Sequence, residues 1–302
     1  MRGIKIFIIS ILLMVIYLIG FKAGLDFERK SGNEALSEHI KALDYIDEGG
    51  TDMYEKIPNI SQKFETKTYN LNGVEFKMIL VEGGTFTMGS NERAAGYGTQ
   101  VSNQKGEHEV TVSSYLIGET EVTRALWNEV MEGNYNNNDL SYPIANITVT
   151  ECREFVKRLN EKAHAAGIIP EGLNFHIPTE AQWEFAAKGG NLSEGFTYSG
   201  SNILSEVAWT SDDGGRVQKV KQKKPNELGI YDMSGNVYEW VADYAADYLI
   251  ETQTNPCNLT PSNNYIKRGG SIYYNDSYRF TTTYRYFYSS TDYTIGLRIC
   301  LY

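Results

Sequence analysis

The stretch Asn226-Glu227-Leu228-Gly229-Ile230-Tyr231-Asp232-Met233-Ser234-Gly235-Asn236-Val237-Tyr238-Glu239-Trp240 decides how this chain folds. It has no helical periodicity. Gly, Asn, Ser and Asp are mixed with short apolar and aromatic pieces, and the rest of the chain after residue 190 has the same texture. Such a composition is typical of short strands joined by long ordered loops. The C-terminal part of the chain is therefore predicted to be irregular β-structure.

Upstream of this region the sequence predicts three helices. The first begins near Thr123. The second begins at Thr148, which forms a capping box with Glu151. The third begins at Thr179 and stops near Gly189, where a glycine is expected after a helix.

Apolar residues that alternate along the chain predict strands before the helices. The pattern covers residues 76–80, turns at 83–84 and resumes at 86–88, and a further strand is expected over 110–117. Strands, then helices, then irregular β-structure together indicate an α+β fold.

The N-terminus carries an apolar run from Ile6 to Phe21, preceded by Arg2 and Lys5 and ended by Lys22. A helix over this run is about 24 Å long, short for a full span and long for the core of a signal peptide. An uncleaved signal anchor, a cleaved signal peptide and a buried core helix remain as alternatives. The first two place the rest of the chain outside the cytoplasm.

The predicted organisation has three parts. Residues 1–24 form a signal anchor or transmembrane helix, residues 25–68 form a stalk or linker, and residues 69–302 form the main domain. The predicted location is membrane-anchored and extracytoplasmic, in the periplasm or at the cell surface. The formal net charge of -10 argues against a nucleic-acid partner, because phosphate contacts need clustered Lys and Arg.

The chain has three cysteines, and their spacing suggests no zinc site. Cys152 shares a helix face with Phe155 and Leu159, so it is expected to pack in the core. One disulfide with one leftover thiol and three free thiols, with Cys257 and Cys300, are both compatible with the sequence.

Several phrases, in this order and spacing, resemble the formylglycine-generating enzyme (sulfatase-modifying factor) family over about residues 69–302. They are Val81 to Gly89, Glu119 to Thr123, Ile177 to Ala187, Asn226 to Trp240, Arg268 to Ser271 and Ile295 to Arg298. The resemblance implies a C-type-lectin-like fold with little regular secondary structure.

The best-known activity of that family is copper-dependent oxidation of a sulfatase cysteine to formylglycine. The resemblance implies two copper-binding cysteines shortly after Gly-Gly-Ser, and soft thiolates suit Cu(I). Residues 272–279 contain no cysteine, and Tyr274 and Arg279 stand at the two positions. We therefore expect no copper and no catalytic residue of that type. Other relatives use iron held by histidines, but the histidines of this chain are not spaced as ligands: His39, His108, His164 and His176.

A structural calcium site of the family has a match in this chain. The resemblance assigns its ligands to the carboxylates of Asp232 and Glu239 and the backbone carbonyls of Gly235 and Val237. Hard oxygen donors in a tight loop suit calcium. The alternative is that the two carboxylates only close the turn by hydrogen bonds.

The window of residues 271–294 has an unusual composition. It holds seven Tyr, five Thr and four Ser, and it contains no Lys, Glu, Gln, Met or Trp. Tyr and small polar residues are typical of recognition surfaces. Every residue type present can also arise from an Asn codon by changes at its adenines. The same is true of the variable proteins of diversity-generating retroelements, which resemble this family.

A diversified binding surface, an undiversified binding surface and a β-rich tail without binding function are the three interpretations of the window. The candidate ligand-binding residues are Tyr273, Tyr274, Asn275, Tyr278, Arg279, Tyr284, Tyr286, Tyr288 and Tyr293. Alternation along strands implies that about half of the tyrosines face outward. Arg285 is expected to brace the fold instead.

The leading hypothesis is a non-catalytic, membrane-anchored binding module whose Tyr-rich C-terminal surface takes a protein or glycan ligand. The alternatives are a sulfatase-maturation-type oxidase and a structural subunit of an envelope complex.

Overall fold

The computed structural model describes residues 65–91, 106–289 and 294–302. The predicted anchor at 1–24, nearly all of the predicted stalk and Tyr293 lie outside these ranges. Within them, no helix is both long and apolar enough to cross a membrane.

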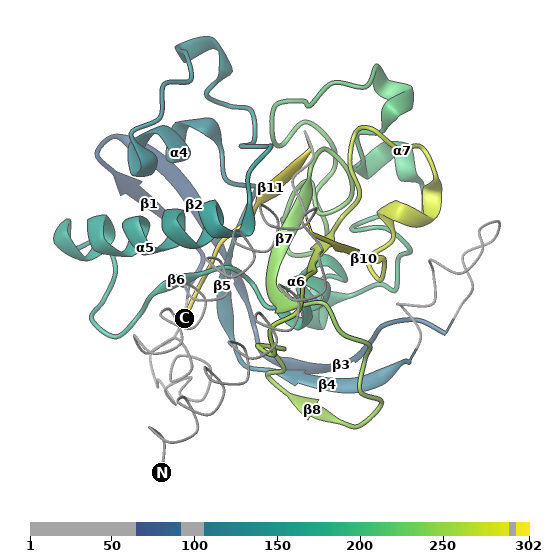
Figure 1. Cartoon of the computed structure of the whole chain (residues 1–302). Coiled ribbons are helices and arrows are strands. Elements are labelled where there is room, and N and C mark those ends of the chain that lie inside the picture. Colours follow the sequence, from purple (N-terminus) through teal and green to yellow (C-terminus); the bar gives the residue numbers. More distant parts are fainter. Residues whose placement is uncertain (1–64, 92–105, 290–293) are drawn as a thin grey trace, which may run out of the picture. The chain divides into compact units, whose positions relative to one another are not determined.

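The strands of the described ranges form three sheets (Figure 1). The first has the order β1-β2-β5-β12-β6, the second β10-β9-β7-β11 and the third β3-β4-β8. The strands are β1 (Lys67–Leu71), β2 (Val74–Val81), β3 (Gly84–Met88), β4 (His108–Val112), β5 (Tyr115–Gly118), β6 (Phe175–His176), β7 (Tyr238–Tyr244), β8 (Gln253–Thr254), β9 (Tyr265–Arg268), β10 (Arg285–Tyr288), β11 (Ile295–Leu297) and β12 (Cys300–Leu301).

Four α-helices lie between β5 and β7 in the sequence. They are α4 (Arg124–Met131), α5 (Val149–Ala165), α6 (Glu180–Ala187) and α7 (Leu204–Val207). The two predicted caps are confirmed: the side chains of Thr148 and Thr179 each accept a hydrogen bond from a first-turn backbone N–H. The first helix begins at the expected place, and the structure shows that Thr123 caps it in the same way. Capping boxes are present at α5, with Glu151, and at α6, with Gln182. The mixed helix and strand content confirms the α+β prediction.

One strand prediction is wrong in a simple way. Residues 110–117 do not form one strand, because Ser113 and Ser114 separate β4 from β5, which belong to different sheets. The Ser113 amide donates to the side chain of Asn255, and the Ser114 hydroxyl accepts from the Gly83 amide. These partners satisfy the backbone where the chain leaves one sheet for the other.

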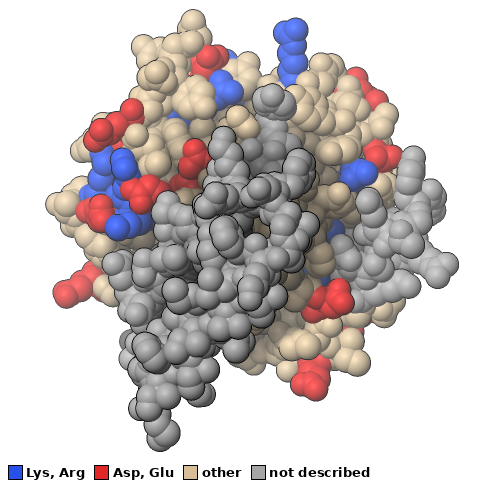
Figure 2. Space-filling model, in the orientation of Figure 1, with Lys and Arg blue, Asp and Glu red and all other residues tan. Residues whose placement is uncertain are grey.

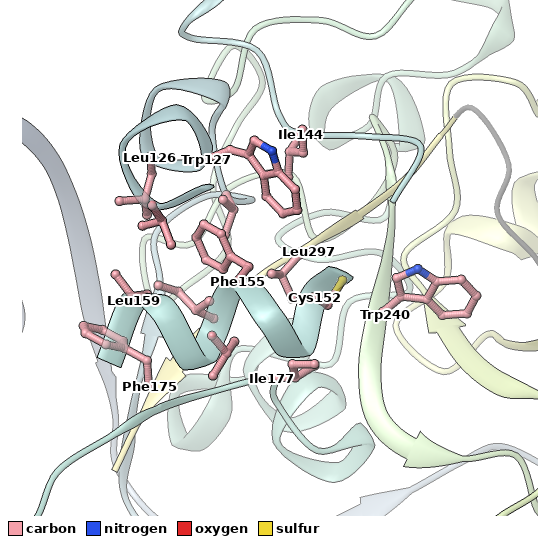
Figure 3. Packing of buried hydrophobic residues seen from close by; sticks show 14 of the residues in the cluster. Leu126, Trp127, Ile144, Cys152, Phe155, Leu159, Phe175, Ile177, Trp240 and Leu297 are labelled. Atoms are coloured by element: carbon pink, nitrogen blue, oxygen red, sulfur yellow. The ribbon is translucent and has the colours of Figure 1, made fainter. Parts of the chain in front are cut away.

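The larger core cluster packs α4 and α5 against the first sheet and against β7 and β11. In Figure 3, Trp127 and Phe155 lie together between the two helices, and Cys152 sits on the buried face of α5. Cys152 is fully buried, as predicted, and all three cysteines are free thiols. Cys300 is also buried, and Cys257 is half-buried.

Candidate ligand-binding surface

Buried carboxylates and guanidinium groups hold the second sheet to the helices. Arg298 donates to both carboxyl oxygens of Glu239, at 2.7 to 3.1 Å, and also to the carbonyl of Gly118. The indole of Trp183 donates to Glu239 Oε2 at 2.6 Å. Both charges of this pair are almost fully buried, so each is neutralised by the other.

Helix α6 supplies two further carboxylates. Arg268 binds Glu184 at 2.5 Å, and Arg285 binds both oxygens of Glu180, at 2.6 and 2.7 Å. The prediction that Arg285 braces the fold is thereby confirmed. We call these six residues the buried frame: Glu180, Glu184, Glu239, Arg268, Arg285 and Arg298.

The charge state of the frame follows from these contacts. Burial is the largest single influence and raises the pKa of Glu184, but the charges of Lys188 and Arg268 and the hydrogen bonds to the carboxylate together outweigh it, so the net pKa is lowered. Glu184 Oε1 also accepts hydrogen bonds from Lys188 Nζ at 2.7 Å and the Gly89 amide at 2.8 Å. Glu184 is therefore ionised in the folded protein at neutral pH.

The Tyr-rich window contains a 3-10 helix and, after it, an edge strand of the second sheet. Helix η7 spans Ser277–Phe280, and β10 pairs with β9 and lies at one edge of its sheet. The window surface, called the Tyr surface below, consists of Tyr273, Tyr274, Tyr278, Arg279, Tyr286 and Tyr288.

The predicted ligand-binding residues differ in how far their side chains are exposed to solvent. Tyr273 is 52% exposed and Asn275 is also exposed, while the other tyrosines of the Tyr surface are half-buried. Tyr284 is only 3% exposed, so it supports the surface from below and does not present its ring. Its ring packs edge-on against Tyr278 and stacks with Tyr286.

Arg279 lies among the aromatic rings. Its guanidinium carbon is 4.3 Å from the ring centre of Tyr274 and 5.1 Å from that of Tyr278. Nε donates to Asp276 at 2.9 Å, and Nη1 donates to the hydroxyl of Tyr284 at 3.1 Å. Burial alone lowers the pKa of Arg279, but Asp276 and the surrounding tyrosines raise it above its ordinary value.

The two positions where the family resemblance implies cysteines are thus in contact. Tyr274 and Arg279 meet at this point of the surface, as a pair of metal ligands has to. Neither side chain offers the thiolate that Cu(I) prefers.

Two residues of the site were missed from the sequence. Lys267 on β9 is 3% exposed, and its Nζ lies 4.1 Å from the ring centre of Tyr238 and 4.3 Å from that of Tyr288. Tyr238 is itself buried, and its ring packs edge-on against Tyr274. In the sequence, Tyr238 comes directly before Glu239, and Lys267 comes directly before Arg268. This position next to a residue of a family motif is the signal that could have identified them.

A loop over residues 211–224 borders the Tyr surface. The Ser211 amide donates to the Tyr274 carbonyl at 2.9 Å, and the Asn275 side chain donates to Asp212 at 3.2 Å. Asn236 connects the two segments, because its side chain binds the Gln218 backbone and its carbonyl accepts from Ile272.

The predicted calcium loop is a turn with left-handed residues, including Asp232 and Asn236. Among the described ranges, no group of three or more His, Cys, Asp or Glu side chains is arranged to hold a metal ion. Both oxygens of Glu239 already accept from Arg298 and Trp183, so Glu239 as placed does not fit a calcium ligand.

Of the two predicted carboxylates, Asp232 fits a cation better than Glu239. Asp232 is buried and accepts a hydrogen bond from the Lys221 amide at 2.7 Å, and burial raises its pKa to about 6. Glu121 is buried too, and neither of its carboxyl oxygens has a hydrogen-bond partner within the described residues. Burial and the charge of Asp232 raise the pKa of Glu121 well above its ordinary range. Calcium therefore stays a prediction, with Glu121 as a carboxylate that the sequence did not indicate.

A cavity of about 500 Å³ lies on the other side of β10, lined by Asp243, Tyr248, Cys257 and Arg285 among others. Small-molecule sites have such volumes. Burial and the charge of Glu180 raise the pKa of Asp243 to about 7. The oxygens of Asp243 accept from two backbone amides, at 2.7 and 2.8 Å, and Arg285 is bound to Glu180. The polar groups of this cavity therefore bind one another.

Exposed charges elsewhere are mixed. Figure 2 shows acidic and basic side chains interspersed on the visible face, close together at the left where α5 lies. The pair Arg158–Glu154, at 2.6 Å on α5, is of this exposed kind.

The family model of the sulfatase-modifying factor enzyme 1-like domain matches residues 64–301. The chain belongs to this family. Its sulfatase-modifying factor domain is 32% identical over 207 residues to the chaperone protein LppX of Paenibacillus barcinonensis, covering 54% of this chain and 70% of that protein. It is 32% identical over 124 residues to the mouse formylglycine-generating enzyme, covering 36% of this chain and 32% of the enzyme.

Solved structures agree with the family fold. Variable protein 1 of Treponema denticola superposes with a TM-score of 0.67 at 27% identity, over 79% of this chain and 99% of that one. PvdO of Pseudomonas aeruginosa superposes with a TM-score of 0.63 at 21% identity, over 80% and 99%, and this likeness concerns the fold alone. The sulfatase-modifying factor domain of this chain thus shares its architecture with a variable protein, as the sequence suggested.

Proposed function

We propose that this sulfatase-modifying factor domain is a non-catalytic binding module that takes a protein ligand on its Tyr surface. The observation that carries the proposal is the presence of Tyr274 and Arg279 at the positions where the family resemblance implies cysteines, in contact on an aromatic surface. Tyrosine offers a large contact area at low entropic cost, and the frame beneath fixes its position.

The comparisons support a protein ligand more than a glycan. One relative is named as a chaperone, and chaperones act on proteins. One structural neighbour is named as a variable protein, which supports a diversified surface. We further propose that the window is diversified and that the N-terminal segment holds the module at the outer side of a membrane. A near-copy of the coding segment differing at adenines, beside a reverse transcriptase gene, is the expected finding; its absence contradicts diversification.

The binding function is tested by selecting binders to the whole chain from a random peptide library. We expect binders that are lost in the double variant Tyr286→Ser/Tyr288→Ser while the melting temperature stays within a few degrees. Peptides whose affinity is unchanged by these substitutions would show that the binding site lies elsewhere.

The alternative roles have their own readouts. Incubation with copper and a Cys-x-Pro-x-Arg peptide should give no aldehyde, and aldehyde formation would restore the oxidase hypothesis. Co-purification of envelope proteins that survives loss of the tyrosines would favour the structural-subunit hypothesis.

The calcium prediction is tested by chelation. If calcium binds, a chelator lowers the melting temperature, and Asp232→Ala and Glu121→Gln each reduce that response. A melting temperature that does not change when the chelator is added would contradict the calcium prediction.

A further inference from the structure

The guanidinium of Arg279 is not saturated by the protein. Arginine has five N–H donors. One donates to Asp276, one donates to Tyr284, and the hydroxyl of Tyr238 also lies beside the group. At least two N–H groups therefore have no acceptor among the described residues.

The arginines of the buried frame differ at their Nη atoms, although the buried Nε of Arg268 has no partner among the described residues. Both Nη atoms of Arg268 and of Arg298 donate to carboxylates or carbonyls. Nη1 and Nη2 of Arg285 likewise bind Ala246 and Glu180. Arg279 is less buried than these residues, and it lies where Tyr274 and Tyr278 form an aromatic wall around it. A guanidinium with two donors left over in an aromatic surround is suited to a carboxylate.

The neighbouring loop adds positive charge. Between Gly214 and Pro225 the chain has five Lys or Arg and no Asp or Glu, on a protein whose net charge is -10. Lys221, Lys223 and Lys224 form ion pairs at the surface. Arg216 and Lys219 are exposed, and neither forms an ion pair with any residue in the described ranges.

We propose that the Tyr surface binds an acidic segment of a protein partner, with a partner carboxylate on the two remaining N–H groups of Arg279. This inference rests on the proposed binding function and specifies its ligand. The basic part of the loop, residues 214–224, guides the approach of the acidic segment, because local positive charge speeds association with an opposite charge. A densely charged polyanion is disfavoured, since the rest of the molecule is acidic and repels it.

The test uses the random peptide library already described, selected on the full-length chain and on three variants. Arg279→Gln removes the charge, Arg279→Lys keeps the charge without the fork, and Arg158→Gln is the control on α5, an exposed arginine with a carboxylate partner. Thermal melting shows which variants are folded.

We expect peptides selected on the natural chain to be enriched in Asp and Glu. Replacing the critical acidic residue by its amide should weaken binding at least tenfold on the natural chain and have little effect on Arg279→Gln. Arg279→Lys should bind with intermediate affinity, and Arg158→Gln should bind as the natural chain does.

The failures are distinguishable. One outcome is that the selected peptides depend on Tyr286 and Tyr288 but are not enriched in acidic residues, or that amide replacements do not change their affinity. This outcome overturns the acidic ligand but still supports a binding module. Tyrosine-dependent binding of heparin without any acidic peptide also overturns the proposal in favour of a polyanion. A library with no tyrosine-dependent binder contradicts both proposals.

Discussion

The buried frame and the Tyr surface both use arginine, but in opposite ways. In the frame, Arg298 is fully buried and pairs with Glu239, so its charge is neutralised inside the fold and cannot reach a ligand. On the Tyr surface, Arg279 is half-buried and holds rings in place while donors remain. The frame is therefore expected to govern stability, and the surface to govern what the molecule binds.

The two regions interleave within one strand. On β10, Arg285 belongs to the frame and Phe287 packs on the smaller core cluster, while Tyr286 and Tyr288 lie over Lys267 on the other side. Successive side chains of a strand point to opposite faces. A variable surface can thus share a strand with fixed structural residues, with alternate positions assigned to each.

The largest expected effect comes from breaking the frame. Arg298→Met leaves the Glu239 carboxylate buried without its partner, and we expect the free energy of unfolding to fall by about 3–5 kcal/mol. Urea denaturation measures the change. Arg158→Met, which removes an exposed pair on α5, should leave the midpoint unchanged. Equal effects of the two substitutions would contradict the role of the frame.

The next effect concerns pH on the cavity side of β10. The folded pKa of Asp243 is raised to about 7 from 3.8, first by burial and then by Glu180. A raised carboxyl pKa means that the folded state holds the proton more tightly, so this stability is present at low pH and is lost as pH rises through about 7. Between pH 5 and pH 8 the natural chain should lose about 3 kcal/mol on this account.

Asp243→Asn cannot ionise and should show a flatter pH dependence over that range, measured by urea denaturation at each pH. The slope is the readout, because the amide also cannot accept from both backbone N–H groups and absolute stability changes. Asp212→Asn, which alters an exposed carboxylate, is the control. An unchanged slope in Asp243→Asn would exclude a raised pKa at this residue.

A smaller effect is expected from the surface side of β10. Tyr286→Ser loses ring contacts with Tyr284 and Lys267 but leaves every frame contact in place. Cross-strand pairs of this kind contribute up to about 1 kcal/mol, and that is the expected loss in unfolding free energy. A loss as large as that of Arg298→Met would mean that the surface and the frame are one unit.

Tyr273→Ser should have the smallest effect on stability. Tyr273 is the most exposed tyrosine of the window within the described residues, so we expect a change below about 0.5 kcal/mol. Binding of selected peptides should nevertheless weaken. A loss of stability without a loss of binding would show that Tyr273 supports the fold and does not contact the ligand.

Local signals explain what could be predicted from the sequence. The caps at Thr148 and Thr179 depend on residues within one turn, and the packing of Cys152 follows from helical spacing. Arg285 was also expected correctly as a structural residue.

What could not be predicted depends on distant partners. Glu239 was a candidate calcium ligand, but it meets Arg298, which lies 59 residues away in the chain. Tyr284 precedes β10 and turns into the core, a position that composition does not reveal. The place of Lys267 beneath the rings depends on the register of β9 with β10.

The most direct test of the account is a saturation library over residues 285–288, sorted for protease resistance of the full-length chain. Positions 286 and 288 should tolerate many residue types and positions 285 and 287 few, so tolerance should alternate along the strand. Uniform tolerance, or restriction at 286 and 288, would contradict the claim that a replaceable binding surface is built on a fixed frame.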